Sequence, residues 1–163
     1  MNRTALAHTA DTLSAITRLE RAMATFYRAC AETPGDARDF WLGLEQEELR
    51  HAQHLQRMAE IVAARPGRFE PDRTFNAAAI QTFMAYLEAL IERVRANEVP
   101  RTDQHRLLSL ARDLEQSLLE SKYHELVKTQ DVEYLALIRT VIADTVAHKS
   151  RIVTRLAATP QSA

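Results

Sequence analysis

Apolar residues recur along most of the chain at alternating spacings of three and four, the pattern of amphipathic helices that share a core. The pattern predicts five helical segments, at residues 4 or 11 to 32, 36–65, 76–96, 102–128 and 131–158. Proline and glycine interrupt helices, and they occur at the predicted ends, in Thr33-Pro34-Gly35, Pro66-Gly67, Val99-Pro100 and Thr159-Pro160. We therefore expect an all-α protein.

The spacing of these helices predicts how the chain is connected. Asp36, Asn76 and Thr102 stand at helix starts, where their side-chain oxygens can cap free backbone N–H groups. The first two helices and the last two are joined by short links, which favours antiparallel hairpins. Residues 66–101, with a loop at 68–73, are long enough to carry the chain back along the bundle. We expect one domain over residues 1–163, a four-helix bundle with a helical crossover.

The most informative stripe lies on the second predicted helix. It contains Leu44, Glu48, His51, Leu55, Met58 and Val62. Glu48 and His51 interrupt an otherwise apolar stripe, and burying an unpaired charge is costly enough that it is normally neutralised, paired or bound to a metal. Something inside the fold must therefore compensate these two side chains.

Three other predicted helices each carry one ionisable residue on an apolar stripe. They are Glu20 on the first, Glu115 on the fourth and His148 on the fifth. Residues three apart on a helix, such as Glu48 and His51, lie on one face and can reach the same metal ion. Carboxylates suit Fe(III), whereas imidazole suits Fe(II) and zinc. The four helices together predict a metal site between them.

Composition and charge narrow the setting of this site. The chain has 163 residues and a net charge of −1, which gives no electrostatic reason to expect nucleic acid or a membrane as partner. It contains no apolar run of roughly 20 residues and no signal-peptide core, so we expect a cytoplasmic location. Cys30 is the only cysteine, which excludes an internal disulfide and a Cys-x-x-Cys metal module.

The segments RLERAMATFY, LEQEELRHAQHL and LARDLEQSLLE resemble the ferritin-like superfamily, and its rubrerythrin-like branch most closely. The resemblance covers almost the whole chain. It implies two iron ions, with Zn or Mn as substitutes. Glu20 and Glu115 would be single-helix ligands, Glu48 would bridge the metals, and His51 and His148 would be terminal ligands.

The resemblance also implies an activity. Peroxide or dioxygen would oxidise Fe(II), in the manner of an oxidoreductase of the peroxidase or ferroxidase kind. A separate electron donor is required, because the chain lacks the four-cysteine iron module of rubrerythrins. A homodimer is expected, and the large apolar residues Trp41 and Phe69 are candidates for its interface.

The chain departs from the family pattern at one ligand position, where Thr145 stands in place of a glutamate. Asp144 is its neighbour and a candidate replacement ligand. The site could hold two metals with water in the gap, one metal or none. The alternative function is therefore a ferritin-like bundle with a degenerate site that acts as a structural or binding module.

Several residues carry a second interpretation. Tyr27 shares a face with Glu20 and is either a hydrogen-bond donor to a ligand carboxylate or a core tyrosine. Cys30 is most simply a small buried residue. Ala147-His148-Lys149-Ser150 suggests a phosphotransfer histidine, but that chemistry needs an exposed ring, and His148 aligns with an apolar stripe.

Overall fold

The computed structural model of the protein describes residues 3–32, 35–72 and 77–161. These residues form five α-helices: α1 (Arg3–Cys30), α2 (Asp36–Ala64), α3 (Ala77–Arg95), α4 (Gln104–Glu120) and α5 (Val132–Ala158). Two 3₁₀ turns (Pro66–Arg68 and Tyr123–Glu125) and two short strands, β1 (Phe69–Pro71) and β2 (Val127–Thr129), connect them. The mostly helical structure confirms the all-α prediction.

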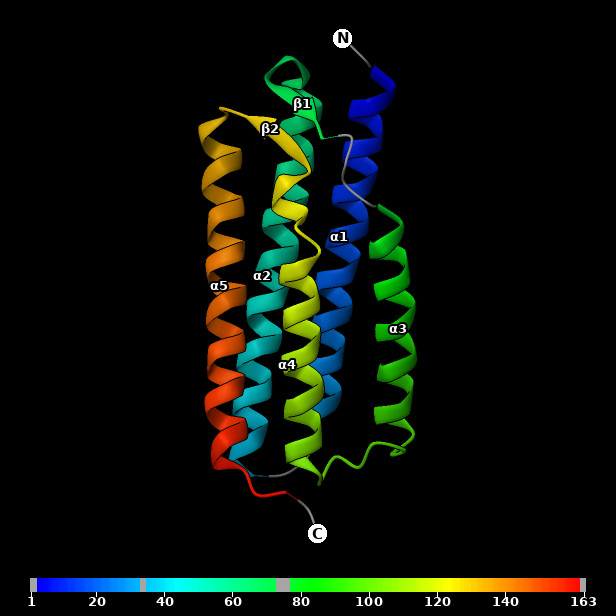
Figure 1. Ribbon diagram of the computed structural model, residues 1–163, viewed down its shortest axis with the longest axis vertical. Helices are drawn as coiled ribbons and strands as arrows, with labels where there is room; N and C mark the ends of the chain where they lie inside the picture. Colours follow the sequence, from blue (N-terminus) through cyan, green and yellow to red (C-terminus); the bar gives the residue numbers. More distant parts are fainter. Residues whose placement is uncertain (1–2, 33–34, 73–76, 162–163) are drawn as a thin grey trace.

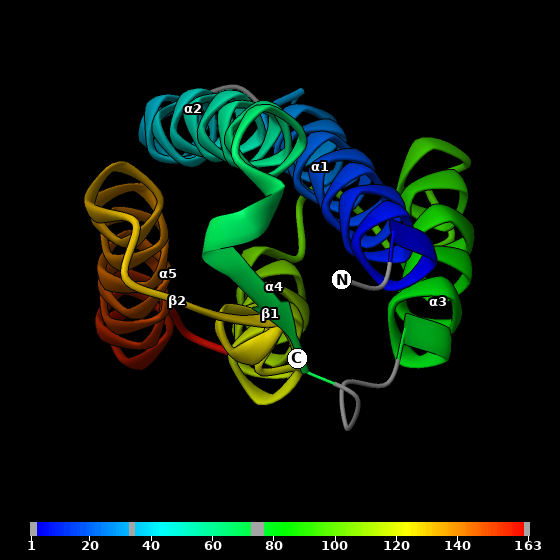
Figure 2. The same ribbon diagram turned by 90° about the horizontal axis from the view of Figure 1, so that it is seen from above.

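The helices run side by side along the long axis of the molecule (Figure 1). Seen from above, α1, α2, α5 and α4 surround a common centre, and α3 lies outside this ring against α1 (Figure 2). The chain reverses direction between α1 and α2 and again between α4 and α5, as the two predicted hairpins require (Figure 1). The helix predicted within the crossover is α3.

The helix starts differ from the prediction at two positions. Residue 35, a glycine with a φ of 110°, precedes α2 as its N-cap, and Asp36 is the first helical residue, so the predicted Asp36 cap is wrong. Asp36 instead places its charge in the first turn, which the helix dipole favours. Asp103 rather than Thr102 caps α4, because its side chain accepts a hydrogen bond from the backbone N–H of Arg106.

Two other predicted boundaries lie outside the described residues. They are the break at Thr33-Pro34 and the cap at Asn76. The last helix, α5, ends at Ala158 as predicted. Asp131 caps the start of α5, because its side chain accepts a hydrogen bond from the backbone N–H of Tyr134.

The end of α4 was predicted eight residues too late. The helix ends at Glu120 instead of Lys128, since Lys122 takes a left-handed conformation (φ 52°, ψ 33°) and the chain turns. The released segment then forms β2, which pairs antiparallel with β1. Residues 69–71 of the predicted loop therefore belong to a two-stranded sheet, where Phe69 lies opposite Thr129.

The core buries both aromatic residues that the sequence suggested for an interface. Trp41 is 0% exposed and Phe69 is 6% exposed. Trp41 stacks on Tyr27, with ring centroids 5.8 Å apart, and its indole N–H donates to Gln104 at 2.9 Å. The interface role of Trp41 and Phe69 is therefore wrong, because neither ring is accessible to a partner.

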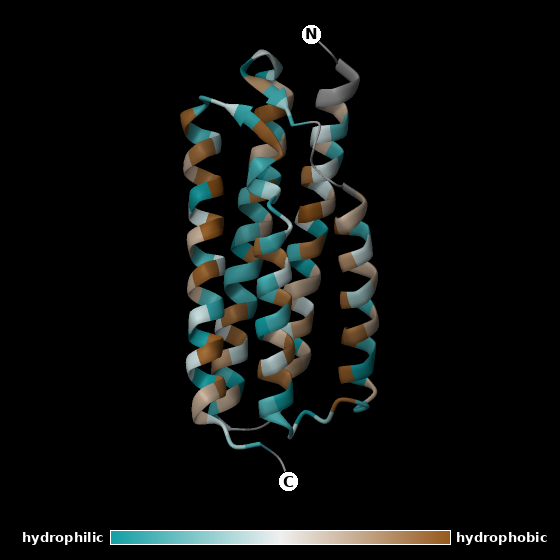
Figure 3. Cartoon of the chain, in the orientation of Figure 1, coloured by the Kyte–Doolittle hydropathy of each residue, from teal (hydrophilic) through white to brown (hydrophobic). Residues whose placement is uncertain are grey.

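Hydrophobic and hydrophilic residues alternate along every helix, as expected for helices that share a core (Figure 3). Cys30 is buried, in line with its assignment as a small core residue. Within the described ranges, none of the helices combines the length and apolar character needed to cross a bilayer.

Candidate metal centre

Five of the six predicted site residues meet in the interior of the bundle. We call them the Glu–His cluster: Glu20 of α1, Glu48 and His51 of α2, Glu115 of α4 and His148 of α5. Glu20, Glu48, Glu115 and His148 are 0% exposed and His51 is 1% exposed. Each of the four helices of the ring therefore contributes an ionisable side chain to the same buried site.

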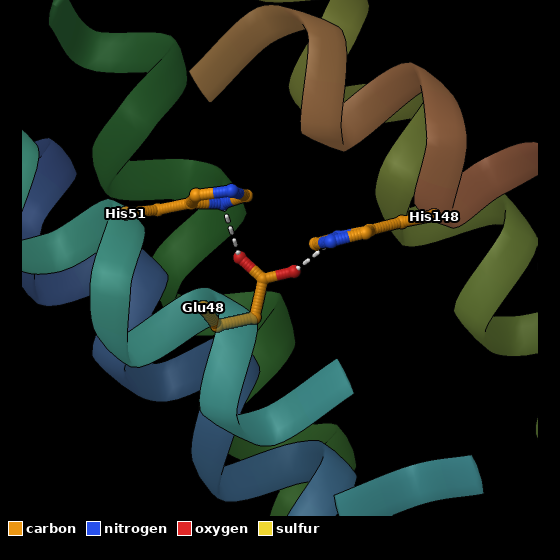
Figure 4. A group of neighbouring side chains, drawn as sticks. All are labelled: Glu48, His51 and His148. Carbon is orange, nitrogen blue, oxygen red and sulfur yellow. Dashed lines mark hydrogen bonds and ion pairs between the residues drawn. The ribbon is translucent and has the colours of Figure 1, made fainter. Parts of the chain in front are cut away.

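Glu48 lies between the two histidines and presents one oxygen to each (Figure 4). Its Oε2 is 3.1 Å from Nδ1 of His51, and its Oε1 is 2.8 Å from Nδ1 of His148. The two imidazole rings are nearly parallel, with centroids 5.1 Å apart and planes 17° apart. Glu48 is thus the carboxylate that links the two histidines.

Each of the remaining two carboxylates lies near one of the histidines. Oε2 of Glu20 lies 3.7 Å from Nδ1 of His51, and Oε1 of Glu115 lies 3.5 Å from Nδ1 of His148. Each imidazole Nδ1 thus has Glu48 and one carboxylate from a single-ligand helix as neighbours. The cluster divides into two similar halves that share Glu48.

The Tyr27 hydroxyl donates a hydrogen bond to Oε1 of Glu115. Burial, and after it the charge of Glu115, raises the pKa of Tyr27 well above its usual value, which keeps the phenol protonated as a donor. The structure thereby decides between the two interpretations of Tyr27. It is a core tyrosine that also orients a carboxylate of the cluster.

The outer nitrogens of the two imidazoles are held by carboxylates. Nε2 of His51 lies 3.4 Å from Oδ2 of Asp144, and Nε2 of His148 contacts Oε2 of Glu47. A carboxylate on the outer nitrogen fixes the tautomer and orientation of a metal-binding histidine. Asp144, predicted as a ligand, is therefore placed on the outer side of His51.

Sequence reasoning missed the role of Glu47. The side chain of Glu47 also pairs with Arg151, with Nη1 3.3 Å from Oε1. The spacing in the sequence could have indicated this role. Glu47 precedes His51 by four residues, just as Asp144 precedes His148 by four. On both helices the carboxylate one turn before the histidine reaches the histidine of the opposite helix.

The three buried glutamates of the cluster have shifted pKa values. Burial, and after it the charge of Glu48, raises the pKa of Glu20 well above its usual value and that of Glu115 to about 6. Burial opposes ionisation of Glu48 as well, yet hydrogen bonds from Glu20 and the two histidines hold its pKa below the usual range. Without a metal, the site thus favours the ionised form of Glu48 and disfavours ionisation of Glu20.

The histidines are charged in this state. Burial opposes their protonation, but carboxylate neighbours outweigh it: Glu20 and Glu48 raise the pKa of His51 to about 11, and Glu115 and Glu48 raise that of His148 to about 10. A metal ion would take the place of the protons at the two Nδ1 atoms, since only the unprotonated imidazole coordinates.

The residues present fit a divalent metal. One ligand atom each of Glu48, His51 and His148 lies within 4.8 Å of the other two. Bonds of about 2.1 Å allow ligand atoms up to roughly 4.2 Å apart, so a slight inward rotation of the side chains suffices. Both oxygens of Glu20 and Oε2 of Glu115 make no well-aligned hydrogen bond within the described residues. A metal ion could take the place of the contacts that Glu20 makes with Glu48 and His51.

Position 145 breaks the symmetry of the two helices. Thr145 precedes His148 by three residues, as Glu48 precedes His51, and is likewise 0% exposed. Its hydroxyl donates to the backbone carbonyl of Val141 at 2.8 Å. The α5 side of the cluster therefore lacks the carboxylate that α2 provides.

Tyr123 is a second residue that the sequence did not point to. Burial, and after it the charge of Glu20, raises the pKa of this phenol well above its usual value, and the neighbouring Thr145 hydroxyl partly offsets the shift. Continued as an α-helix, α4 would have turned position 123 about 80° away from Glu115. The turn at Lys122 instead leads into the 3₁₀ segment in which Tyr123 is buried.

Comparisons of the chain with protein-family models, with curated proteins and with solved structures found no match.

Proposed function

We propose that the Glu–His cluster binds two divalent metal ions, bridged by Glu48. The position of Glu48 is the main support for this proposal, because its two oxygens face the Nδ1 atoms of His51 and His148. Glu20 and Glu115 then supply one further carboxylate to each half. The resemblance of the sequence to rubrerythrin-like members of the ferritin-like superfamily supports iron as the metal.

In this proposal Fe(II), when bound, would supply electrons to peroxide or dioxygen. The protein's own residues hold the ligands and exclude water. Asp144 and Glu47 orient the two imidazoles from outside, and Tyr27 holds Glu115 by a hydrogen bond. Full burial of all the carboxylates of the cluster keeps bulk water from the centre. Since Cys30 is the only cysteine, electrons for turnover come from a separate donor.

Anaerobic titration with Fe(II) tests the proposal. We expect saturation at two ions per chain and, after addition of hydrogen peroxide, a ferric-oxo absorption band of matching stoichiometry. Glu48→Gln should lower the stoichiometry or the affinity, because its neutral amide cannot bridge two cations. Glu92→Gln, at a side chain that is 72% exposed, is the matched control and should behave as the wild type. A folded protein that takes up no metal would refute the proposal.

A second candidate function is the structural or binding module with a degenerate site. Thr145 favours it, because the α5 side lacks a carboxylate ligand. The charges of the cluster are also partly balanced without metal, by protonated histidines around Glu48. This candidate predicts no metal uptake. It also predicts that Glu48→Leu combined with His51→Leu raises the Tm, because apolar replacement of a buried ion pair is often stabilising.

A further inference from the structure

The outward face of α5 carries apolar residues that the chain leaves uncovered. Val132, Val146 and Val153 are 80%, 52% and 43% exposed, and they are three of the five large hydrophobic side chains exposed in the described part of the chain. Seen from above, α5 lies beside α2 and α4, and among the described helices none covers its outer side as α3 covers α1 (Figure 2). This face is therefore open to a partner.

The exposed valines belong to a stripe that repeats every seven residues. Spacings of four and three alternate along it from Val132 to Ala157, and every member is exposed. We call these eight residues the α5 stripe. One column of the stripe holds small residues and the other holds larger ones: Ala136, Ala143, Ser150 and Ala157, and Val132, Arg139, Val146 and Val153. Two positions in every seven with this spacing form the seam along which helices pack in coiled coils.

The α5 stripe is almost free of charge. Arg139 is its only charged residue, although 26% of the residues of the chain are charged. The exposed face of α2, by contrast, carries Arg50 and Glu60. Arg151, at the edge of the stripe, already pairs with Glu47 within the chain. The stripe therefore offers a partner apolar contact rather than ion pairs.

The α5 stripe is complementary to itself in one orientation. When two α5 helices run antiparallel, with residue 136 of one opposite residue 153 of the other, every larger residue faces a small one. The resulting pairs are Ala136 with Val153, Arg139 with Ser150, Ala143 with Val146 and Val132 with Ala157. A parallel pair would set each residue against its own copy and bring the two Arg139 charges together, which is repulsive. Charge and side-chain size both favour the antiparallel pair.

The size of the stripe indicates a weak association. A helix of 27 residues is about 40 Å long and about 10 Å wide, so the stripe covers roughly 400 Å² on each copy. This is about half of the roughly 800 Å² that each partner buries in a standard interface. Thr140, Ala147 and Thr154 are exposed and uncharged and extend the contact along one side. We expect a dissociation constant in the micromolar range.

We propose that a second copy of this chain covers the α5 stripe, with the two α5 helices antiparallel about a two-fold axis midway between residues 136 and 153. The contact is isologous, so both copies supply the same face. It does not depend on metal binding by the Glu–His cluster, because the stripe is exposed whereas His148 on the same helix is buried.

Sedimentation velocity of the full chain over a range of concentrations tests the proposal. The wild type should shift from monomer to dimer with a Kd in the micromolar range. Ala143→Glu should raise the Kd at least tenfold, because the new carboxylate of each copy would lose water against Val146 of the other copy. Ala89→Glu, at an exposed alanine of α3, is the matched control and should dimerise as the wild type does. Circular dichroism checks that both variants are folded.

Ser150→Glu should strengthen the dimer. The new carboxylate would lie opposite Arg139 of the other copy, and the two-fold symmetry produces this pair twice. The Kd should fall several-fold, as expected for two exposed ion pairs. Ser150→Arg, which sets two positive charges against each other, should raise the Kd. In a parallel pair Ser150→Glu would instead weaken the dimer, because residue 150 would face its own copy.

Cysteine variants test the orientation directly. A mixture of Ala136→Cys and Val153→Cys should form a disulfide between the two variants on oxidation. Neither variant alone should crosslink, because the two copies of residue 136 would lie about 25 Å apart along the helix axis, far beyond the reach of a disulfide. The natural Cys30 is buried and does not compete.

Each outcome decides the proposal. A wild type that stays monomeric at its highest soluble concentration overturns it and leaves the stripe to a partner of different sequence. Equal dimerisation of Ala143→Glu and Ala89→Glu places the interface elsewhere and also overturns it. Crosslinking of Ala136→Cys with itself, and not with Val153→Cys, overturns the antiparallel arrangement. Because these measurements need no metal, their failure leaves the proposed function standing.

Discussion

Asp144 of α5 lies 3.4 Å from the outer nitrogen of His51 on α2, and Glu47 of α2 contacts the outer nitrogen of His148 on α5. The two contacts are reciprocal. Each helix supplies one histidine to the cluster, and the carboxylate one turn before that histidine contacts the histidine of the other helix. Each carboxylate polarises and orients a ring whose Nδ1 faces Glu48. The two helices therefore support each other's ligands, and Asp144 acts on the cluster through His51.

Replacing Asp144 tests this relationship. Asp144→Asn should weaken metal binding about 10- to 100-fold, the usual effect of removing the outer partner of a metal-bound histidine. The number of metal ions bound at saturation should not change. Isothermal titration with Co(II) gives both quantities. Asp113→Asn, at a side chain that is 63% exposed, is the control. A lower stoichiometry in Asp144→Asn would show that Asp144 is itself a ligand.

Metal binding should release protons. The pKa of His51 is raised to about 11 and that of His148 to about 10, so both rings are protonated at pH 7 in the metal-free protein. Each ring must lose a proton to coordinate. We expect release of at least two protons per chain at saturation, and tighter binding as the pH rises from 7 toward 10.

Calorimetric titrations in buffers of different ionisation enthalpy count these protons. The apparent enthalpy of binding should decrease linearly with the ionisation enthalpy of the buffer, with a slope of at least two in magnitude. His124→Ala removes a histidine whose side chain is 41% exposed and should give the same slope. A slope near zero would contradict the protonated state of the two rings.

The metal-free protein should lose stability as the pH rises above neutral. A histidine whose pKa is higher in the folded than in the unfolded chain contributes stability below its unfolded pKa, here 6.5, and loses it as the pH passes the folded pKa. The raised pKa values of Glu20 and Glu115 change stability in the same direction, for Glu115 as the pH rises from 4.5 through about 6. The Tm of the metal-free protein should therefore fall between pH 7 and 10.

Thermal scans at several pH values, followed by circular dichroism, measure this decline. The metal-loaded protein serves as the internal control, because its imidazoles are already unprotonated and its Tm should vary less over the same range. A metal-free Tm that stays constant or rises between pH 7 and 10 would contradict the expected charge state.

The inner face of the bundle could be predicted from the sequence because burial and helical period are local properties. Glu20, Glu48, Glu115 and His148 were found as polar positions on apolar stripes, and each is buried in the structure. Their convergence was predicted because four helices each carry such a residue, although stripe patterns alone do not specify the rotation of one helix against another. The mutual distances come only from the structure.

Features that depend on pairing between distant segments were missed. The β1–β2 pair joins residues 69–71 with residues 127–129, and short runs of three residues carry no recognisable alternation. The position of Tyr123 depends on the turn after α4, which the helical periodicity of LARDLEQSLLE did not predict. The cap at Gly35 was missed because Asp36 is the stronger N-cap type, yet the backbone at residue 35 takes a positive φ, which glycine adopts readily.

The left-handed backbone at Lys122 ends α4 at an energetic cost. Residue 122 has a φ of 52°, a left-handed conformation that costs a non-glycine residue roughly 1–2 kcal/mol. Lys122→Gly removes this cost but adds flexibility to the unfolded chain, so the free energy of unfolding should be unchanged or rise by up to about 1 kcal/mol. Lys122→Val should lower it by about 1 kcal/mol or more, since a β-branched side chain is strained at positive φ. Urea denaturation measures both changes, and equal stability of the two variants would show that the turn does not require this backbone conformation.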